Sequence, residues 1–189
     1  MNLFFDTETT GLPRNWKAPV TDLENWPRLV QIAWLQYDSE GRQVSGRDYI
    51  IRPEGFKIPD DASRVHGITT ERAVQEGNEL KEVLEEFSGL MNEATLLVAH
   101  NMSFDEKILG AEFLRNGTKN NLSQIKKLCT MKESTGYCEI PGNYGFKWPK
   151  LSELHLKLFN HDFEEAHNAR VDIEACAKCF WELKRRGII

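Results

Sequence analysis

The chain has 189 residues, of which 40% are hydrophobic and 28% are charged, as in one globular domain with a sizeable core. Its formal net charge is −5, whereas a protein that grips a long duplex through the phosphates is normally basic. No stretch is apolar enough for a membrane span, and the N-terminus lacks a signal-peptide pattern. We therefore expect one cytoplasmic domain over residues 1–189 that has no membrane partner and, if it acts on nucleic acid, holds few nucleotides.

The four cysteines, Cys129, Cys138, Cys176 and Cys179, are expected to be thiols in a reducing cytosol. Cys176 and Cys179 have the spacing of a metal knuckle, but they fall in a strongly helical stretch. No second pair has zinc-finger spacing. The pattern therefore argues against a zinc site.

The first twelve residues contain the clearest candidate site. The apolar run at residues 3–5 predicts a buried strand. Asp6 and Glu8 lie two apart, so on a strand their side chains point to the same face. Gly11 then allows the backbone to turn. Two neighbouring carboxylates repel each other unless a cation lies between them, and oxygen ligands suit Mg²⁺ or Mn²⁺.

Further elements follow from the apolar periodicity in chain order. We expect strands at residues 28–37, 48–52, 96–99 and 125–129, with a hairpin between the first two. We expect helices from residue 69, over 80–90, from a cap at Asn101 or Ser103, over 151–158 and over 169–183. The segments 13–27 and 136–149 contain Pro, Gly or Asn and are predicted to be loops. This order predicts an α/β fold with a mixed five-stranded sheet flanked by helices.

Three polar clusters fall at the ends of these elements, where the fold can bring them to one mouth. They are Asp6 with Glu8, the segment HNMSFD at 100–105, and His167 with Asp172. The carboxylates among them, which we expect to bind metal, are Asp6, Glu8, Asp105 and Asp172. Four negative charges in one cleft predict two divalent cations. Two such ions are the standard device for in-line attack at phosphorus.

His167 is the candidate general base. Histidine has a suitable pKa near neutral pH, and His167 precedes Asp172 by five residues across the start of a helix. Taken alone, it could be a surface histidine in the acidic loop that contains Glu164 and Glu165. Its spacing from Asp172 and the order of the three clusters along the chain favour the catalytic role.

The segments FDTETTGL, HNMSFD and HNARVD resemble the three motifs of the DEDDh family of 3′→5′ exonucleases, over residues 3 to about 180. This family includes the epsilon proofreading subunit of bacterial DNA polymerase III, ribonuclease T and oligoribonuclease. The resemblance implies a ribonuclease-H-like fold. It also implies that Asp6 bridges two metals, that Glu8 and Asp172 complete the first metal site, and that Asp105 supports the second.

The resemblance also implies substrate contacts around the terminal nucleotide. The residues implied are Thr9, Leu12, His66, Asn101 and Phe104. For Phe104, core packing beside Ile108 is an equal alternative. For His100, a role in orienting its own loop is an equal alternative to a role in substrate binding.

The preferred function is a 3′→5′ exonuclease on single-stranded or frayed DNA 3′ ends, with a DNA polymerase as a possible partner. One alternative keeps the chemistry on RNA, where a contact to the 2′-OH would decide. Another is a non-catalytic nucleic-acid-binding subunit of a polymerase. We expect no tail after the last helix of the kind by which proofreading subunits attach.

Aromatic and basic residues outside the motifs leave further options. Trp16 and Trp26 lie on the first loop, where packing is favoured over stacking on bases. Lys147 and Lys150 flank Trp148 near the expected site. They either contact phosphates or form an ordinary solvated face.

Overall fold

The computed structural model describes residues 1–161, 163 and 168–189. Its centre is a five-stranded sheet of order β3-β2-β1-β4-β5. The strands are β1 (Asn2–Thr9), β2 (Leu29–Tyr37), β3 (Gln43–Ile50), β4 (Leu96–Ala99) and β5 (Lys126–Cys129). β2 runs antiparallel to both β1 and β3, whereas β4 and β5 are parallel to β1. The predicted mixed sheet is therefore confirmed.

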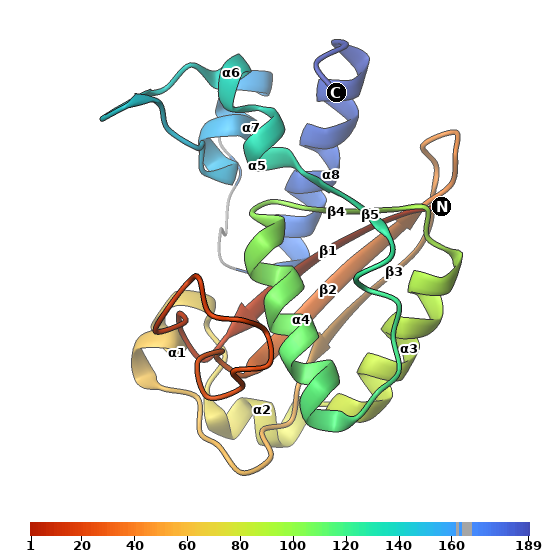
Figure 1. Ribbon diagram of the computed structural model, residues 1–189, viewed down its shortest axis with the longest axis vertical. Helices are drawn as coiled ribbons and strands as arrows, with labels where there is room; N and C mark the ends of the chain where they lie inside the picture. Colours follow the sequence, from red (N-terminus) through yellow and green to blue (C-terminus); the bar gives the residue numbers. More distant parts are fainter. Residues whose placement is uncertain (162, 164–167) are drawn as a thin grey trace.

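Helices cover both faces of the sheet because successive side chains of β1 point to opposite sides. Leu3 and Phe5 pack with α3 (Leu80–Glu93) and α4 (Met102–Asn116), whereas Phe4 packs with α8 (Ala169–Arg185). Figure 1 shows α4 crossing one face while α8 lies behind the sheet. The inner face predicted for the last helix, residues 169–183, is buried as expected.

The remaining elements are short. They are α1 (Asp60–His66), α2 (Thr70–Glu76), α5 (Thr130–Glu133), α6 (Thr135–Cys138), α7 (Leu151–Phe159), and the hairpin strands β6 (Pro141–Gly142) and β7 (Gly145–Phe146). No helix within the described parts of the chain has both the length and the apolar character that crossing a membrane requires.

Two predicted segments differ from the structure, and the helices α1 and α5 were not predicted. α1 was not predicted, although acidic residues in its first turn and Gly67 at φ 73° after its last turn are ordinary helix signals. The third strand begins at Gln43, earlier than 48, because an edge strand with an exposed face lacks apolar alternation. The segment 136–149 contains most of α6 and the β6–β7 hairpin, where only a loop was expected.

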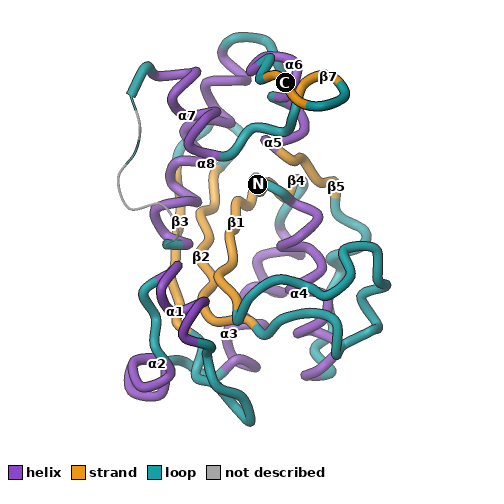
Figure 2. The backbone as a smooth tube through the Cα atoms, turned by 90° about the vertical axis from the view of Figure 1, so that its left-hand side faces the viewer, coloured by secondary structure: helices purple, strands orange, loops and turns teal. Residues whose placement is uncertain are grey.

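The first loop, residues 13–27, packs against α4 (Figure 2). Trp26 is buried, and its Nε1 donates to the carbonyl of Pro19 at 3.0 Å. Lys107 of α4 donates to the carbonyl of Trp16 at 2.8 Å and lies 4.8 Å from the Trp26 ring centroid. The predicted packing role of Trp26 is confirmed, while Trp16 remains half-exposed.

All four cysteines are free and buried. Cys176 packs toward the sheet, whereas Cys179 packs toward α7. Cys176 and Cys179 thus belong to different apolar clusters.

Candidate active site

Three of the predicted metal-binding carboxylates lie together at the end of β1. Asp6 and Glu8 share the face of β1 that α8 covers, and Asp172 lies in the first turn of α8. One carboxylate oxygen from each lies within 4.8 Å of the other two. Asn168 begins this helix, with its side chain accepting from the backbone N–H of Arg170 at 3.0 Å. A local strand pattern and a capped helix thus bring two sequence-distant motifs together.

Asp105 joins the group from the first turn of α4. Its Oδ1 accepts from the backbone N–H of Thr7 at 3.1 Å and from the Thr7 hydroxyl at 2.7 Å. The register of β4 with β1 ends at the pair of Phe4 and Val98. Thr7 therefore lies past the part of β1 that pairs with β4, and its N–H is free to donate to Asp105. This fixes one oxygen of a carboxylate that is only 3% exposed.

The four carboxylates crowd one another electrostatically. Burial, then the charges of Asp105, Asp172 and Glu8, raise the pKa of Asp6 well above its ordinary value. Burial and the charges of Asp172 and Asp105 raise the pKa of Glu8 to about 8. Burial raises the pKa of Asp105 to about 7, against the opposing hydrogen bonds from Thr7.

No Lys or Arg of the described residues forms an ion pair with Asp6, Glu8 or Asp105. The charges of these three carboxylates are therefore not balanced by Lys or Arg side chains of those parts of the chain. Clustered carboxylate oxygens are the donor set that hard divalent cations prefer. The residues present thus fit a divalent metal ion.

The predicted base, His167, lies outside the described residues, so its role stays a prediction. Asn168 and Asp172, which follow it in the third motif, are described and occupy the start of α8.

The turn after β1 presents the predicted nucleotide contacts. Thr9 donates its hydroxyl to the carbonyl of Gly11 at 2.6 Å, and Gly11 has φ 139°. The side chain of Leu12 is 73% exposed, which leaves it accessible to a base. His66 is buried beside this turn. Burial lowers the pKa of His66, while its contact with the Thr9 backbone opposes that shift.

His100 is held by the protein through both ring nitrogens. Its Nδ1 lies 3.0 Å from the Thr130 hydroxyl, and its Nε2 lies 3.1 Å from the carbonyl of Pro149. Burial lowers the pKa of His100 to about 4, so the ring is neutral near pH 7. These contacts favour the alternative in which His100 orients neighbouring segments.

Asn101 and Phe104 lie at the start of α4. Asn101 is the N-cap residue, as one of the two predicted positions, and has φ 70°. Its side chain makes no capping hydrogen bond, so the expected side-chain cap is absent at this residue. The ring of Phe104 lies 5.7 Å from that of Trp16 and packs against the main core. Phe104 thus sits where the core meets the first loop, consistent with packing and with the predicted position beside the site.

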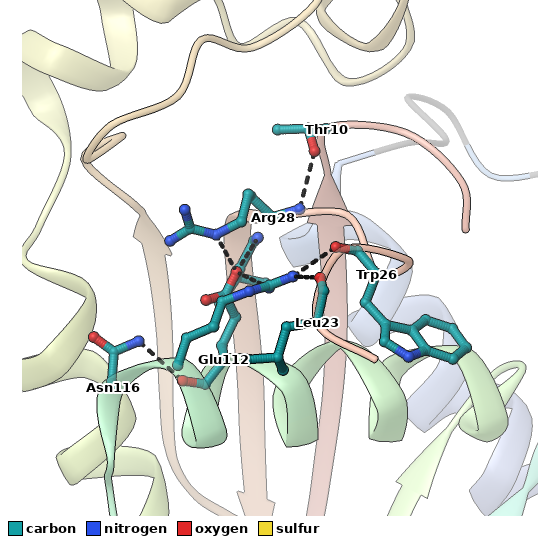
Figure 3. Close-up of polar contacts among 8 residues, drawn as sticks. Thr10, Leu23, Trp26, Arg28, Glu112 and Asn116 are labelled. Carbon is teal, nitrogen blue, oxygen red and sulfur yellow. Dashed lines mark hydrogen bonds and ion pairs between the residues drawn. The ribbon is translucent and has the colours of Figure 1, made fainter. Parts of the chain in front are cut away.

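Sequence reasoning missed a buried ionic cluster that joins α4 to the start of β2 and to the turn after β1 (Figure 3). Oε1 of Glu112 accepts from Arg28 Nε at 2.9 Å, from the N–H of Leu29 at 3.0 Å and from Arg115 Nη1 at 2.9 Å. The backbone N–H of Arg28 in turn donates to the Thr10 hydroxyl at 2.9 Å. The cluster therefore links α4 to the turn that follows Glu8. Its sequence signal was a glutamate between the apolar residues Ala111 and Phe113 of a core helix.

The family model described as Exonuclease matches residues 3–180 of the chain. The chain belongs to this exonuclease family. The resemblance of the three motifs to DEDDh exonucleases is thereby confirmed, as is the predicted enzyme class. The span of the match covers all three clusters.

Two curated relatives of this exonuclease are replication proteins by name. The DNA polymerase III subunit epsilon of Treponema pallidum is 31% identical over 177 residues, covering 93% of the chain and 73% of the relative. DNA polymerase III PolC-type of Mycoplasmopsis pulmonis is 31% identical over 189 residues, covering 97% of the chain and 12% of the relative. The chain therefore spans only a small part of the PolC-type protein.

Solved structures of Exonuclease I from E. coli share the fold of this exonuclease. The complex with a dA16 oligonucleotide has a TM-score of 0.74 at 20% identity, covering 98% of the chain and 41% of that protein. A zinc-bound complex with single-stranded DNA has a TM-score of 0.75 at 20% identity, covering 98% and 40%. At this identity the likeness establishes the fold, and it confirms the expected ribonuclease-H-like architecture.

Proposed function

We propose that this chain is a divalent-metal-dependent 3′→5′ exonuclease that removes nucleoside monophosphates from DNA 3′ ends. The observation that carries the proposal is the convergence of Asp6, Glu8 and Asp172, each of which places one carboxylate oxygen within 4.8 Å of the other two. Its buried neighbour Asp105 adds a fourth carboxylate. The family assignment supplies the reaction class.

In this proposal Asp6, Glu8, Asp105 and Asp172 hold two ions, Mg²⁺ or Mn²⁺. When bound, such ions neutralise the phosphodiester charge and activate water for in-line attack at phosphorus. His167 accepts a proton from the attacking water. Thr7 keeps one oxygen of Asp105 fixed, so that the other is free to face the site.

The terminal nucleotide would lie over the turn at Thr9 and against the exposed side chain of Leu12. His66 lies beside that turn, and Asn101 and Phe104 begin the helix that carries Asp105. Hydrogen bonds position terminal groups, while apolar contacts accept any base. Such a pocket would favour a free 3′ end over a particular sequence.

DNA is the proposed substrate because the relatives are named as DNA polymerase III proteins. The structures of similar fold hold a dA16 oligonucleotide or single-stranded DNA. The same names support association with a DNA polymerase as part of the proposal. RNA cleavage is the outcome that would redirect the substrate assignment.

The test uses purified chain with DNA and RNA oligonucleotides of one sequence, each labelled at the 5′ end. We expect stepwise shortening of single-stranded DNA with Mg²⁺ or Mn²⁺ and none with EDTA. Slower shortening of RNA would support the DNA assignment. Comparable cleavage of a circular single strand would indicate an endonuclease, and binding without any cleavage would support the non-catalytic subunit.

A further inference from the structure

A projecting hairpin carries most of the exposed aromatic side chains. We define the 140–150 hairpin as residues 140–150, in which β6 pairs with β7 and the N–H of Lys147 donates to the carbonyl of Ile140 at 2.9 Å. Tyr144 is fully exposed, Phe146 is 52% exposed and Trp148 is 61% exposed. Among the described residues the other large exposed aromatic is Trp16. Clustered exposed apolar groups mark interaction surfaces.

Lysines accompany these rings. The Nζ of Lys132 lies 5.9 Å from the centroid of the Trp148 ring. Lys147 is paired with Glu153 at 2.6 Å, but neither Lys132 nor Lys150 forms an ion pair with any described residue. The chain as a whole has a net charge of −5, whereas this surface combines aromatic side chains with two lysines that form no ion pair with the described residues. It is the surface chemistry that single-stranded nucleic acid prefers.

The hairpin is anchored at the edge of the sheet that carries the carboxylates. The carbonyl of Pro149, next to Trp148, is 3.1 Å from His100, which follows β4 and precedes the helix of Asp105. Lys132 lies on α5, directly after β5. β1, β4 and β5 are parallel neighbours, so their carboxyl ends share one edge and β5 lies ~10 Å from β1. Figure 1 shows the hairpin projecting outward near α6.

We propose that the 140–150 hairpin binds the single strand on the 5′ side of the cleaved nucleotide, with bases stacked on Trp148 and phosphates near Lys132 and Lys150. This inference rests on the proposed exonuclease function. The chain is acidic overall, and these lysines provide local attraction for the phosphates. Stacking tolerates any sequence because every base has a π face. A protein partner could also use exposed aromatics, but the unpaired lysines and the connection to the site favour a polyanion.

Binding is tested with fluorescently labelled oligothymidylate by anisotropy, in the Asp6→Asn background with Mg²⁺ so that the strand is not degraded. Trp148→Ala should weaken binding of a dodecanucleotide about tenfold, the size expected for one lost stack. Trp148→Phe keeps a π face and should retain most of the affinity. Val44→Ala changes an exposed apolar residue on β3 and should have no effect.

Kinetics in the wild-type background separate the hairpin from the site. Trp148→Ala should raise KM for the dodecanucleotide while leaving cleavage of a dinucleotide unchanged, because a dinucleotide is too short to reach the hairpin. A substitution at Trp148 can also disturb its neighbour Pro149, whose carbonyl contacts His100. The double variant Tyr144→Ser with Phe146→Ser therefore provides a second probe at exposed positions. It should act in the same direction without lowering the melting temperature.

The two proposals fail in different ways. If the wild type cleaves both oligonucleotides and neither variant changes Kd or KM, the hairpin inference is overturned and the exonuclease function stands. That result would also direct the search toward a protein occupant of the hairpin. If the wild type cleaves nothing but binding still depends on Trp148, the hairpin inference stands and the proposed function is wrong.

Discussion

Two buried carboxylates on one helix have opposite surroundings. Asp105 and Glu112 lie seven residues apart on α4, and they are 3% and 0% exposed. Glu112 is paired with Arg28 and Arg115, which neutralise its charge from within the chain. Asp105 accepts hydrogen bonds from Thr7, forms no ion pair with the Lys and Arg residues that the structure describes, and lies beside other carboxylates. Burial is the same, but the source of counter-charge differs.

This difference separates a structural acid from a candidate catalytic one. A buried charge that is paired by the protein is costly to remove on one side only, because its partners stay behind without compensation. A buried charge without a protein partner raises its own pKa and those of its neighbours. Replacing such a residue with a neutral one should therefore stabilise the metal-free protein. The sign of the stability change therefore tests each assignment.

The largest expected effect is on activity at Asp6. Asp6→Asn should abolish exonuclease activity, because Asp6 is proposed to hold both ions. The same substitution should raise the melting temperature of the metal-free protein at alkaline pH, where these carboxylates ionise, since it removes one of the repelling charges. Activity assays with Mg²⁺ and thermal unfolding in EDTA measure the two effects. Full wild-type activity in EDTA would sink the metal assignment.

The next effect concerns His167. His167→Ala should lower the single-turnover rate by roughly 10²–10⁴-fold, the usual contribution of a positioned base. Metal binding should persist because the carboxylates remain, which titration calorimetry with Mn²⁺ would check. Wild-type activity should fall at acidic pH as the histidine becomes protonated, and the variant should lack that limb. An unchanged rate and pH profile in the variant would exclude His167 as the base.

Glu112 should show the opposite stability change. Glu112→Ala should destabilise the protein by about 3 kcal/mol, because two arginines and the N–H of Leu29 lose their acceptor. Urea unfolding measures this change. Glu76→Ala, which removes a charge from the exposed ion pair with Arg72, is the matched control and should have little effect. Equal changes in the free energy of unfolding for both variants would mean that the buried cluster contributes no more to stability than an exposed ion pair.

The smallest effect is a pH dependence of stability. The pKa of Glu8 is about 8 and that of Asp105 about 7, above the values of about 4 expected in the unfolded chain. The native state then binds more protons, so stability present at pH 4 is lost as the pH rises toward 8. The melting temperature in EDTA should fall over this range, and the gain from Mg²⁺ should grow. A gain from Mg²⁺ that is constant between pH 5 and 8 would contradict this linkage.

Local patterns in the sequence determined much of the site. The alternation of β1 placed Asp6 and Glu8 on one face, and the helical period of α8 placed Asp172 on the turn that meets them. The order of strands and helices was enough to predict the mixed sheet. These features depend on residues that are close in sequence, so a single sequence displays them.

Only the tertiary structure decided how each charge is compensated. Thr7 meets Asp105 across 98 positions, and Arg28 meets Glu112 across 84. His100 reaches Pro149 across 49 positions, which anchors the 140–150 hairpin near the site. No local period encodes such pairs, because they form when the sheet and helices pack and bring distant segments within hydrogen-bond distance. For that reason the residue types of the site could be predicted from the sequence, whereas their electrostatic balance could not.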